Sequence, residues 1–380
     1  MTGANRPIGY FVHHQGRGHA ERAAAIANHL VTKRPVTLFS ARDDIFPDLR
    51  GGITVRRIPS LFEPNGSEAP EMASLPMPDT VHCAPLGWQG ITEAFAEIAM
   101  WFARERPALF VTDVSAELGQ LARLCSVPHV AVLQHGERSD PGHMAAYDSA
   151  VGLLAPYAAR LEQHERPRRH RDKTHYAAGV GIASGAAPTT EAARRKLGLD
   201  RADDIVLVIA GGGGEGTPNP PLTLGARAEP KSRWITIGKV RREWHETEPG
   251  NLEHRGWVDN PVEWIAAADR IVSSCGNTTV HMVLAAQKPW IVIPEWRYFD
   301  EQLRKAQVLD REGMAATSAQ WPSHAAAWTR LWNAARSIDV TSQASLIDLD
   351  AAETAANWID DLATRLWRGA ETRPALEVVQ

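Results

Sequence analysis

The chain has 380 residues, of which 44% are hydrophobic and 23% charged, a balance that is typical of globular proteins and excludes a largely disordered chain. This length is too great for a single core and favours two domains. A formal net charge of −4 provides no excess of basic residues, so we expect no nucleic-acid partner.

Short apolar runs alternate with amphipathic stretches from the first residues onward. The segment 59–87 interrupts this alternation and is rich in Pro, Gly and Ser. That segment is predicted to be a long loop beside a cleft. The alternation predicts a parallel sheet with helices on both faces. The predicted strands are 8–12, 36–39, 53–58, 109–112 and 127–133, and the predicted helices are 20–30, 91–104 and 117–124.

A second series of the same kind follows a stretch rich in Gly, Ala and Pro. It opens with a helix at 191–197, capped by Thr189 or Thr190 and ended by Gly198. The pattern predicts two doubly wound domains, at 1–171 and 189–345, joined by a linker at 172–188, with a closing helix within 346–370 that packs back toward the first domain. Further predicted elements are the strands 205–210, 234–237, 270–273 and 290–293 and the helices 278–286 and 351–367.

The first candidate site follows the first strand, where Gly16, Arg17, Gly18 and His19 open a helix. Glycines allow a sharp turn, and an imidazole at this edge suits general-base catalysis, because its pKa lies near neutral pH. Asp113 ends another strand at the same edge, so it is a candidate to orient His19 and stabilise its imidazolium. Two alternatives stay open: His19 simply packs or caps, and Asp113 caps the helix that starts near Ser115.

Two turns in the second half are suited to binding an anion. Residues 211–214 are four consecutive glycines after a buried strand, so their backbone amides can approach a pyrophosphate. Residues 273–279 form a turn of small and hydroxyl-bearing residues that opens a helix, whose free N–H groups and dipole favour negative charge. Two such turns in one domain favour a diphosphate ester as ligand.

The segments 276–279, 285–289, 291–294 and 300–302 together resemble the donor signature of the GT-B glycosyltransferases. The chain is especially similar to the family of the peptidoglycan N-acetylglucosaminyltransferase (glycosyltransferase family 28) and to the UDP-glycosyltransferases. The resemblance covers both halves in the same order, and it implies two Rossmann-like domains that face each other across a cleft. The first would bind the acceptor and the second a nucleotide sugar.

The resemblance also implies roles for individual residues. His19 corresponds to the catalytic base and Asp113 to its partner, while Gly16, Arg17 and Gly18 form the acceptor-side loop. One position departs from the pattern, because Met282 stands where these families have a ribose-binding glutamate, and a thioether is a poor acceptor for ribose hydroxyls. The implied donor-binding residues are Gly212, Gly213, Gly214, Trp257, Val258, Gly276, Asn277, Thr278, Thr279, His281, Asp300, Glu301 and Gln302.

The predicted activity is therefore inverting, metal-independent transfer of a hexosyl group, without a cofactor, from a nucleotide-diphosphate sugar such as a UDP-sugar to an acceptor hydroxyl. The acceptor is left open between a lipid-linked molecule, a glycan and a small molecule, and the oligomeric state is also left open. Two alternatives keep the fold: a nucleotide-sugar hydrolase or epimerase, and a non-catalytic partner subunit that binds nucleotide sugar.

The sequence also indicates where the protein resides. A strand pattern that starts at residue 8 leaves no room for a secretory signal, no apolar run is long enough to span a membrane, and the three cysteines are widely spaced. We therefore expect a cytoplasmic protein. The basic stretch 166–173 has two interpretations, a solvated loop or a peripheral contact with anionic lipid headgroups at the inner face of the membrane.

Overall fold

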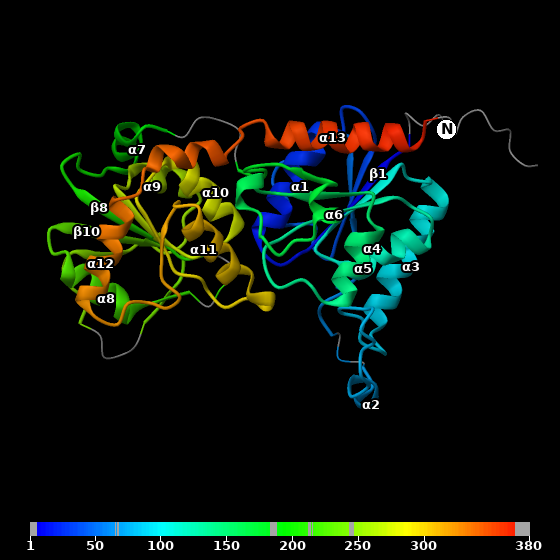
Figure 1. The fold of residues 1–380 in the computed structure, drawn as a ribbon, viewed down its shortest axis with the longest axis horizontal. Helices are drawn as coiled ribbons and strands as arrows, with labels where there is room; N and C mark the ends of the chain where they lie inside the picture. The colour runs from blue at the N-terminus through cyan, green and yellow to red at the C-terminus, as the bar shows by residue number, and fades with distance from the viewer. Residues whose placement is uncertain are drawn as a thin grey trace, which may run out of the picture.

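The computed structural model describes residues 6–64, 66, 68–182, 188–211, 214, 216–242 and 247–368. The chain forms two α/β units that lie side by side, each built on a parallel sheet (Figure 1). The first sheet has seven strands in the order β3-β2-β1-β4-β5-β6-β7, and the second has six in the order β12-β10-β8-β13-β14-β15. Every neighbouring pair in both sheets is parallel. The predicted pair of doubly wound parallel sheets is thereby confirmed.

The first unit contains all the predicted strands of the first half and two more beyond them. Its strands are β1 (Ile8–Val12), β2 (Val36–Ser40), β3 (Ile53–Arg57), β4 (Leu109–Asp113), β5 (His129–Val132), β6 (Gly152–Ala155) and β7 (Thr174–Tyr176). Its helices are α1 (Arg17–Leu30), α2 (Pro70–Ala73), α3 (Gln89–Glu105), α4 (Ala116–Leu124), α5 (Pro141–Ser149), η2 (Ala159–Leu161) and α6 (Arg168–Arg171).

The second unit repeats the arrangement, with a small two-stranded sheet added at its edge. Its strands are β8 (Asp204–Ile209), β9 (Thr217–Pro218), β10 (Ser232–Ile237), β11 (Val240–Arg241), β12 (Leu252–His254), β13 (Arg270–Ser273), β14 (Trp290–Val292) and β15 (Ala316–Thr317). Its helices are α7 (Thr190–Leu197), α8 (Asn219–Ala228), α9 (Pro261–Ala267), α10 (Asn277–Ala286), η3 (Tyr298–Asp300), α11 (Glu301–Arg311), α12 (Ala325–Arg336) and η4 (Val340–Leu346).

Local chemistry sets several of these helix ends. Of the two threonines predicted as caps of α7, Thr189 is the cap, and its hydroxyl accepts from the backbone N–H of Ala192 at 3.2 Å. Gly198 ends that helix with a left-handed φ of 67°, a conformation that glycine adopts without a Cβ clash. Helix α1 begins at Arg17, earlier than predicted, because Gly16 turns the chain with a φ of 87°. His19 therefore lies in the first turn of α1.

The strand order places two crevices opposite each other. In the first sheet β1 lies between β2 and β4, and in the second β8 lies between β10 and β13. Chain connections leave such a central strand in opposite directions, which opens a crevice at the carboxyl ends of the strands, where ligands of doubly wound sheets bind. The ends of β1 and β4 in the first sheet and of β8, β12, β13 and β14 in the second lead to the candidate site residues.

The last helix, α13 (Ala351–Leu366), runs back over the first unit (Figure 1). Its apolar face, including Ala355, Ile359 and Leu362, joins the core formed by α1 and the first sheet. Beyond it, the indole N–H of Trp367 donates to the backbone carbonyl of Ala108 at 2.8 Å. The C-terminal part of the chain therefore packs on the unit formed by its N-terminal part.

Candidate functional site

His19 and Asp113 meet at the carboxyl edge of the first sheet. The ring Nδ1 of His19 lies 3.0 Å from Oδ1 of Asp113. Asp113 is completely buried, whereas the side chain of His19 keeps 19% of its surface exposed. Because an ionised carboxylate only accepts hydrogen bonds, Nδ1 carries the proton and Nε2 is left as the basic nitrogen. This is the tautomer that general-base catalysis through Nε2 requires.

A third residue, Arg22, completes this cluster and was not identified from the sequence. Its Nε donates to Oδ2 of Asp113 at 3.1 Å, and its Nη2 lies 2.8 Å from both carboxylate oxygens. Arg22 is itself buried, with 2% of its surface exposed. Its position three residues after His19 on α1 places both side chains on one helix face, a spacing that the sequence displays.

Arg22 changes the electrostatics expected of a His–Asp pair. Burial by itself raises the pKa of Asp113, but the charges of Arg22 and His19 and their hydrogen bonds outweigh it and bring that pKa to about 2. The Nη2 atom of Arg22 also lies 3.0 Å from Nδ1 of His19. Since both nitrogens carry protons, this contact is not a hydrogen bond. Asp113 therefore fixes the orientation of the imidazole, while Arg22 offsets much of its stabilisation of an imidazolium.

The alternative interpretation of Asp113 as a helix cap is wrong. Helix α4 is capped by Ser115, whose hydroxyl accepts from the backbone N–H of Leu118 at 3.2 Å. The interpretation of His19 as a cap is also not supported, because the residue at the N-terminal boundary of α1 is Gly16, which has no side chain. The carboxylate and the imidazole are thus engaged with each other and with Arg22.

The His19 loop lies directly opposite the start of α10 in the second unit. A Cβ placed on Gly18 would come 2.9 Å from Oγ1 of Thr278. That hydroxyl donates to Oε2 of Glu21 at 3.2 Å, and burial raises the pKa of Glu21. The two candidate loops therefore touch across the domain boundary. The absence of a side chain at Gly18 allows the close approach of the two segments.

No side chain caps the first turn of α10. Gly276 precedes the helix without a side-chain cap, and Asn277 begins it. The amide oxygen of Asn277 accepts from Nζ of Lys305 at 2.5 Å, and that same Nζ lies 3.1 Å from the carbonyl of Cys275. Lys305 is buried. Its positive charge lies beneath the turn and is paired with the carboxylate of Glu301 at 3.5 Å.

Two further residues of α10 point into the protein. Thr279 and His281 are buried at 9% and 3% exposure. Burial, and then the charges of Lys305 and Arg22, lower the pKa of His281 to about 3, so its imidazole is neutral near pH 7. Met282 packs against an apolar cluster that is continuous across both units, which is consistent with an apolar residue at this position.

The glycine-rich loop after β8 adjoins the turn before α10. A Cβ on Gly211 would lie 3.6 Å from Oγ of Ser274. Gly212 and Gly213 lie outside the described residues. A Cβ on Gly214 would meet the carboxylate of Glu295, so a side chain at this position would displace that carboxylate. The carboxylate of Glu295 is paired with Arg297 at 2.7 Å, which offsets its negative charge beside a loop predicted to bind diphosphate.

Trp257 forms one wall of a cavity of about 490 Å³ at the end of β10. The indole is 58% exposed. Gly238, which also lines this cavity, accommodates the backbone of Ala210 so closely that a Cβ would lie 2.3 Å from its carbonyl oxygen. The cavity is therefore adjacent to the start of the glycine-rich loop. Val258, by contrast, packs against the core cluster.

The predicted sugar-binding residues separate into three environments. Asp300 is exposed and has a left-handed φ of 51°. Glu301 begins α11, and burial would raise its pKa, but Lys305 and Arg138 hold it low. Gln302 is buried, and its side-chain oxygen accepts from the backbone N–H groups of Cys275 and Glu295, both at 2.9 Å. Glu301 is thus a charged carboxylate, whereas Gln302 ties the turn before α10 to the loop after β14.

On the side of the first unit, an open cavity of about 880 Å³ lies along the loop that precedes α1. Gly16, Gln15 and His14 line it, as does Gly214 from the second unit. Arg17 is exposed. The ring of His13 lies beside that of His19, with centroids 5.4 Å apart, and burial followed by the charges of His19 and His14 lowers its pKa to about 3.

The basic stretch 166–173 is largely paired within the fold. Arg166 is buried and contacts Glu162 at 2.9 Å, Arg169 contacts Asp148 at 2.7 Å, and Lys173 donates to three backbone carbonyls. A peripheral contact with anionic headgroups stays a prediction.

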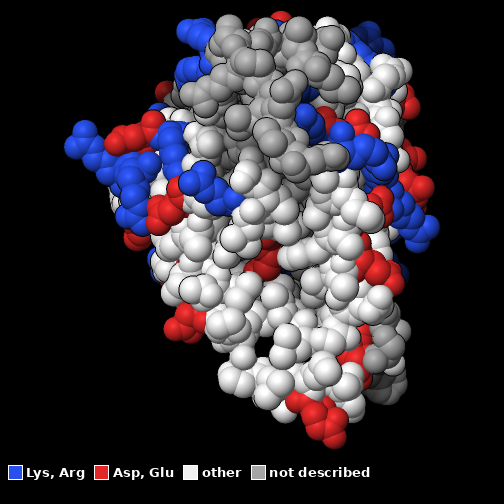
Figure 2. Space-filling view, turned by 90° about the vertical axis from the view of Figure 1, so that its right-hand side faces the viewer, with Lys and Arg blue, Asp and Glu red and all other residues white. Residues whose placement is uncertain are grey.

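The face shown in Figure 2 has few basic side chains at its lower end, which the segment around α2 forms. No Lys or Arg occurs between Arg57 and Arg104. Four large apolar side chains of that segment are exposed: Met72, Leu75, Met77 and Leu86. Among the residues that the structure describes, no helix is long and apolar enough to cross a membrane.

Comparison with known proteins gives matches in structure alone. No protein-family model matches the chain, and no curated protein matches its sequence. Similar solved structures include the glycosyltransferase of kitacinnamycin, with 16% identity, 94% of this chain and 99% of that chain covered and a TM-score of 0.61. MurG of Acinetobacter baumannii is 13% identical, and the match covers 95% of this chain and 99% of that chain with a TM-score of 0.59.

A UGT transferase from Siraitia grosvenorii, solved in complex with UDP, has 14% identity, 94% and 99% coverage and a TM-score of 0.63. These similarities extend over nearly the whole of each chain and so include both sheets. The chain therefore has the GT-B fold of these glycosyltransferases, as the sequence motifs predicted.

Proposed function

We propose that this protein is a glycosyltransferase that moves a hexosyl group from a nucleotide-diphosphate sugar to an acceptor hydroxyl with inversion. One observation carries the proposal. The imidazole of His19, bonded to the buried Asp113, lies in the same short turn as Gly18, which abuts Thr278 at the start of α10. A proton acceptor and an anion-binding helix end thus face each other. The solved structures with UDP support a uridine nucleotide.

In this mechanism Nε2 of His19 takes the proton of the acceptor hydroxyl as its oxygen attacks the anomeric carbon. The bond between that carbon and the phosphate oxygen breaks, and the nucleoside diphosphate leaves with the electron pair. Its developing charge is stabilised by the amides of the first turn of α10 and by the charge of Lys305 below them. The cavity beside Trp257 is suited to the nucleobase, and Glu301 to the sugar hydroxyls.

A donor screen with a His19→Ala variant tests the proposal. We expect wild-type protein to produce a glycosylated product with at least one nucleotide sugar, as detected by mass spectrometry over an acceptor panel. The variant should lose about 10²- to 10⁴-fold in transfer rate, the range expected for a general base, and should keep its affinity for the nucleotide. Release of free sugar at the same rate with and without acceptors would instead favour hydrolysis. Full transfer by the variant would contradict the assignment of His19.

A further inference from the structure

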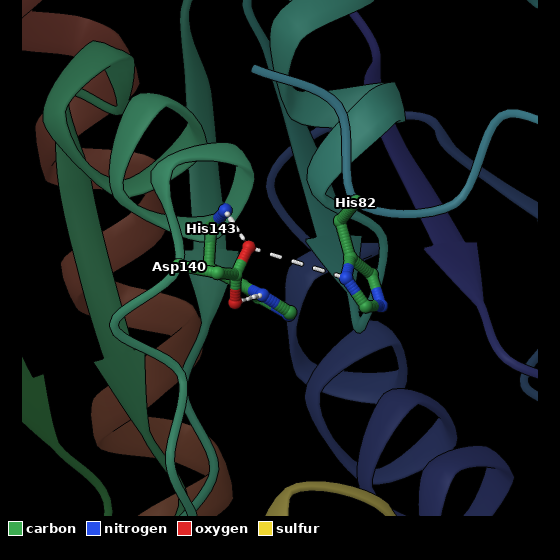
Figure 3. Close-up of side chains that lie close together, drawn as sticks. All are labelled: His82, Asp140 and His143. Carbon is green, nitrogen blue, oxygen red and sulfur yellow. Dashed lines mark hydrogen bonds and ion pairs between the residues drawn. The ribbon is translucent and has the colours of Figure 1, made fainter. Parts of the chain in front are cut away.

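Three side chains outside the proposed reaction centre lie close together at the junction of the two units (Figure 3). They are His82 from the long loop, and Asp140 and His143 from the start of α5, with candidate ligand atoms within 4.8 Å of one another. Two imidazoles and one carboxylate are ligands that transition metals accept. The cluster therefore has the composition of a metal site.

The hydrogen bonds of His143 disfavour a metal. Its Nδ1 lies 2.6 Å from Oδ2 of Asp140, and its Nε2 lies 3.2 Å from Nη1 of Arg138. Because a guanidinium only donates, Nε2 must accept, and the ring proton then sits on Nδ1 and is donated to Asp140. A metal on Nδ1 would move the proton to Nε2, where it would oppose the N–H of Arg138. The arrangement is that of a hydrogen-bonded relay.

Arg138 extends this relay from the first unit to the second. It is buried, and its Nη2 donates to Oε1 of Gln134 at 2.9 Å. The same nitrogen lies 3.6 Å from Oε2 of Glu301, and the guanidinium lies 4.7 Å from the centre of the Phe299 ring. The Arg138 side chain is thus fixed by His143 at one nitrogen and faces the carboxylate of Glu301 with the other.

The backbone just before Glu301 packs against the loop of the first unit that carries Gly136, Glu137 and Arg138. The N–H of Glu137 donates to the carbonyl of Phe299 at 2.7 Å, and a Cβ on Gly136 would lie 2.8 Å from that carbonyl. Phe299 and Asp300 have φ values of 61° and 51°, a left-handed conformation that costs non-glycine residues free energy and persists only where surrounding contacts stabilise it. The first unit supplies those contacts.

We propose that Asp140, His143 and Arg138 form a positioning relay that holds the Glu301 carboxylate where it binds the sugar of the donor. This proposal rests on the proposed function, because it takes Glu301 as a sugar ligand. Arg138 acts through Glu301 and is a positioning residue. Sugar recognition by the second unit then depends on contact with the first, which ties donor selection to the assembled cleft.

The contribution of the relay to sugar binding is measured by comparing the affinity for a nucleotide sugar with the affinity for its nucleoside diphosphate. Calorimetry with UDP-glucose, UDP-N-acetylglucosamine and UDP compares the wild type with Arg138→Gln, Arg138→Lys, His143→Phe and Asp140→Asn. We expect the Gln variant to bind the preferred UDP-sugar about 10- to 100-fold more weakly, because the partly buried Glu301 carboxylate loses a positive charge that lies 3.6 Å away, and to bind UDP unchanged. The Lys variant keeps the charge and should recover part of the loss. In Asp140→Asn the asparagine can still cap α5, so a change in sugar affinity in this variant reports on the relay and not on loss of the helix cap.

Arg160→Gln is the matched control. Arg160 also joins the two units, with its Nε 2.6 Å from Oε2 of Glu312, but it does not contact the site. Its substitution should leave the ratio of the two affinities unchanged, and an equal loss in this variant would reduce Arg138 to a general docking contact. Unaltered sugar discrimination in Arg138→Gln would overturn the relay alone. Failure of the wild type to bind any of the three ligands would overturn the proposed function as well.

His82→Ala separates the relay from a metal site. The His82 ring packs on those of His143 and Phe299, but its Nδ1 lies 4.0 Å from Asp140, beyond hydrogen-bond distance. Its removal should therefore leave the hydrogen bonds of the relay and the sugar discrimination unaltered. Equilibrium dialysis against Zn²⁺ provides the second measurement. Binding of one equivalent of Zn²⁺ by the wild type, lost in His82→Ala together with sugar discrimination, would show a metal centre and refute the relay.

Discussion

Replacement of Asp113 by asparagine keeps the shape of the side chain and removes its charge. The carboxylate is fully buried and accepts from Arg22 through both oxygens. Asparagine can retain one of these hydrogen bonds, but the guanidinium of Arg22 is then buried without a counter-charge. We therefore expect Asp113→Asn to affect both folding and activity, and the two effects can be separated.

The structure sets the size of the expected changes in the free energy of unfolding and in the transfer rate. The pKa of Asp113 is lowered from 3.8 to about 2, so its ionised form contributes about 2 kcal/mol. Because the folded pKa is the lower one, this stability is present above about pH 4 and is lost as the pH falls through about 2. Above about pH 4, Asp113→Asn loses that contribution and leaves a buried cation unpaired, for a total of about 3–5 kcal/mol. Transfer should fall by about 10²- to 10⁴-fold as His19 loses its tautomer lock.

A double-mutant cycle with Arg22→Met separates the two roles. Urea denaturation measures the free energy of unfolding of the wild type, both single variants and the double variant, and initial rates measure transfer. We expect the double variant to regain most of the stability lost in Asp113→Asn, because no charge stays buried, and to stay inactive. Wild-type stability of Asp113→Asn would refute the account of the buried pair, and restored transfer in the double variant would reduce Asp113 to a counter-ion for Arg22.

Two other predictions concern closure and acid stability. Gly18→Ala places a methyl group 2.9 Å from Oγ1 of Thr278, so it should hold the two loops apart. A misplacement near 1 Å should lower the transfer rate by about 10-fold or more, and wild-type rates in this variant would show that the loops need not touch. The buried His281 and His129 have pKa values lowered from 6.5 to about 3 and about 4, chiefly by burial. As the pH falls, the unfolded chain therefore takes up protons before the folded one. The free energy of unfolding should fall from about pH 6.5 downward, by about 2 kcal/mol for each histidine at pH 5. A constant free energy of unfolding between pH 7.5 and 5 would contradict the burial of these histidines in the neutral form.

Much of the fold was predictable because its signals are local. The strands at 8–12 and 270–273 have the predicted bounds, and Thr189 and Gly198 delimit α7 as their chemistry suggests. Elements with weaker signals were not predicted. Helix α8 opens with two prolines and includes a glycine, and β15 has two residues. Their structure depends on packing against neighbouring elements, which periodicity does not reveal.

The sequence by itself determined the doubly wound architecture and the turns that carry Gly16–His19 and the start of α10, because strand-helix alternation and glycine placement are properties of contiguous residues. Tertiary structure alone decided the partners of those turns. Arg22 neutralises Asp113, Lys305 lies beneath α10, and Arg138 reaches Glu301 across the domain boundary. Each of these contacts joins residues from different elements, and long side chains of this kind acquire a fixed partner only when packing removes the solvent that otherwise competes for their charge.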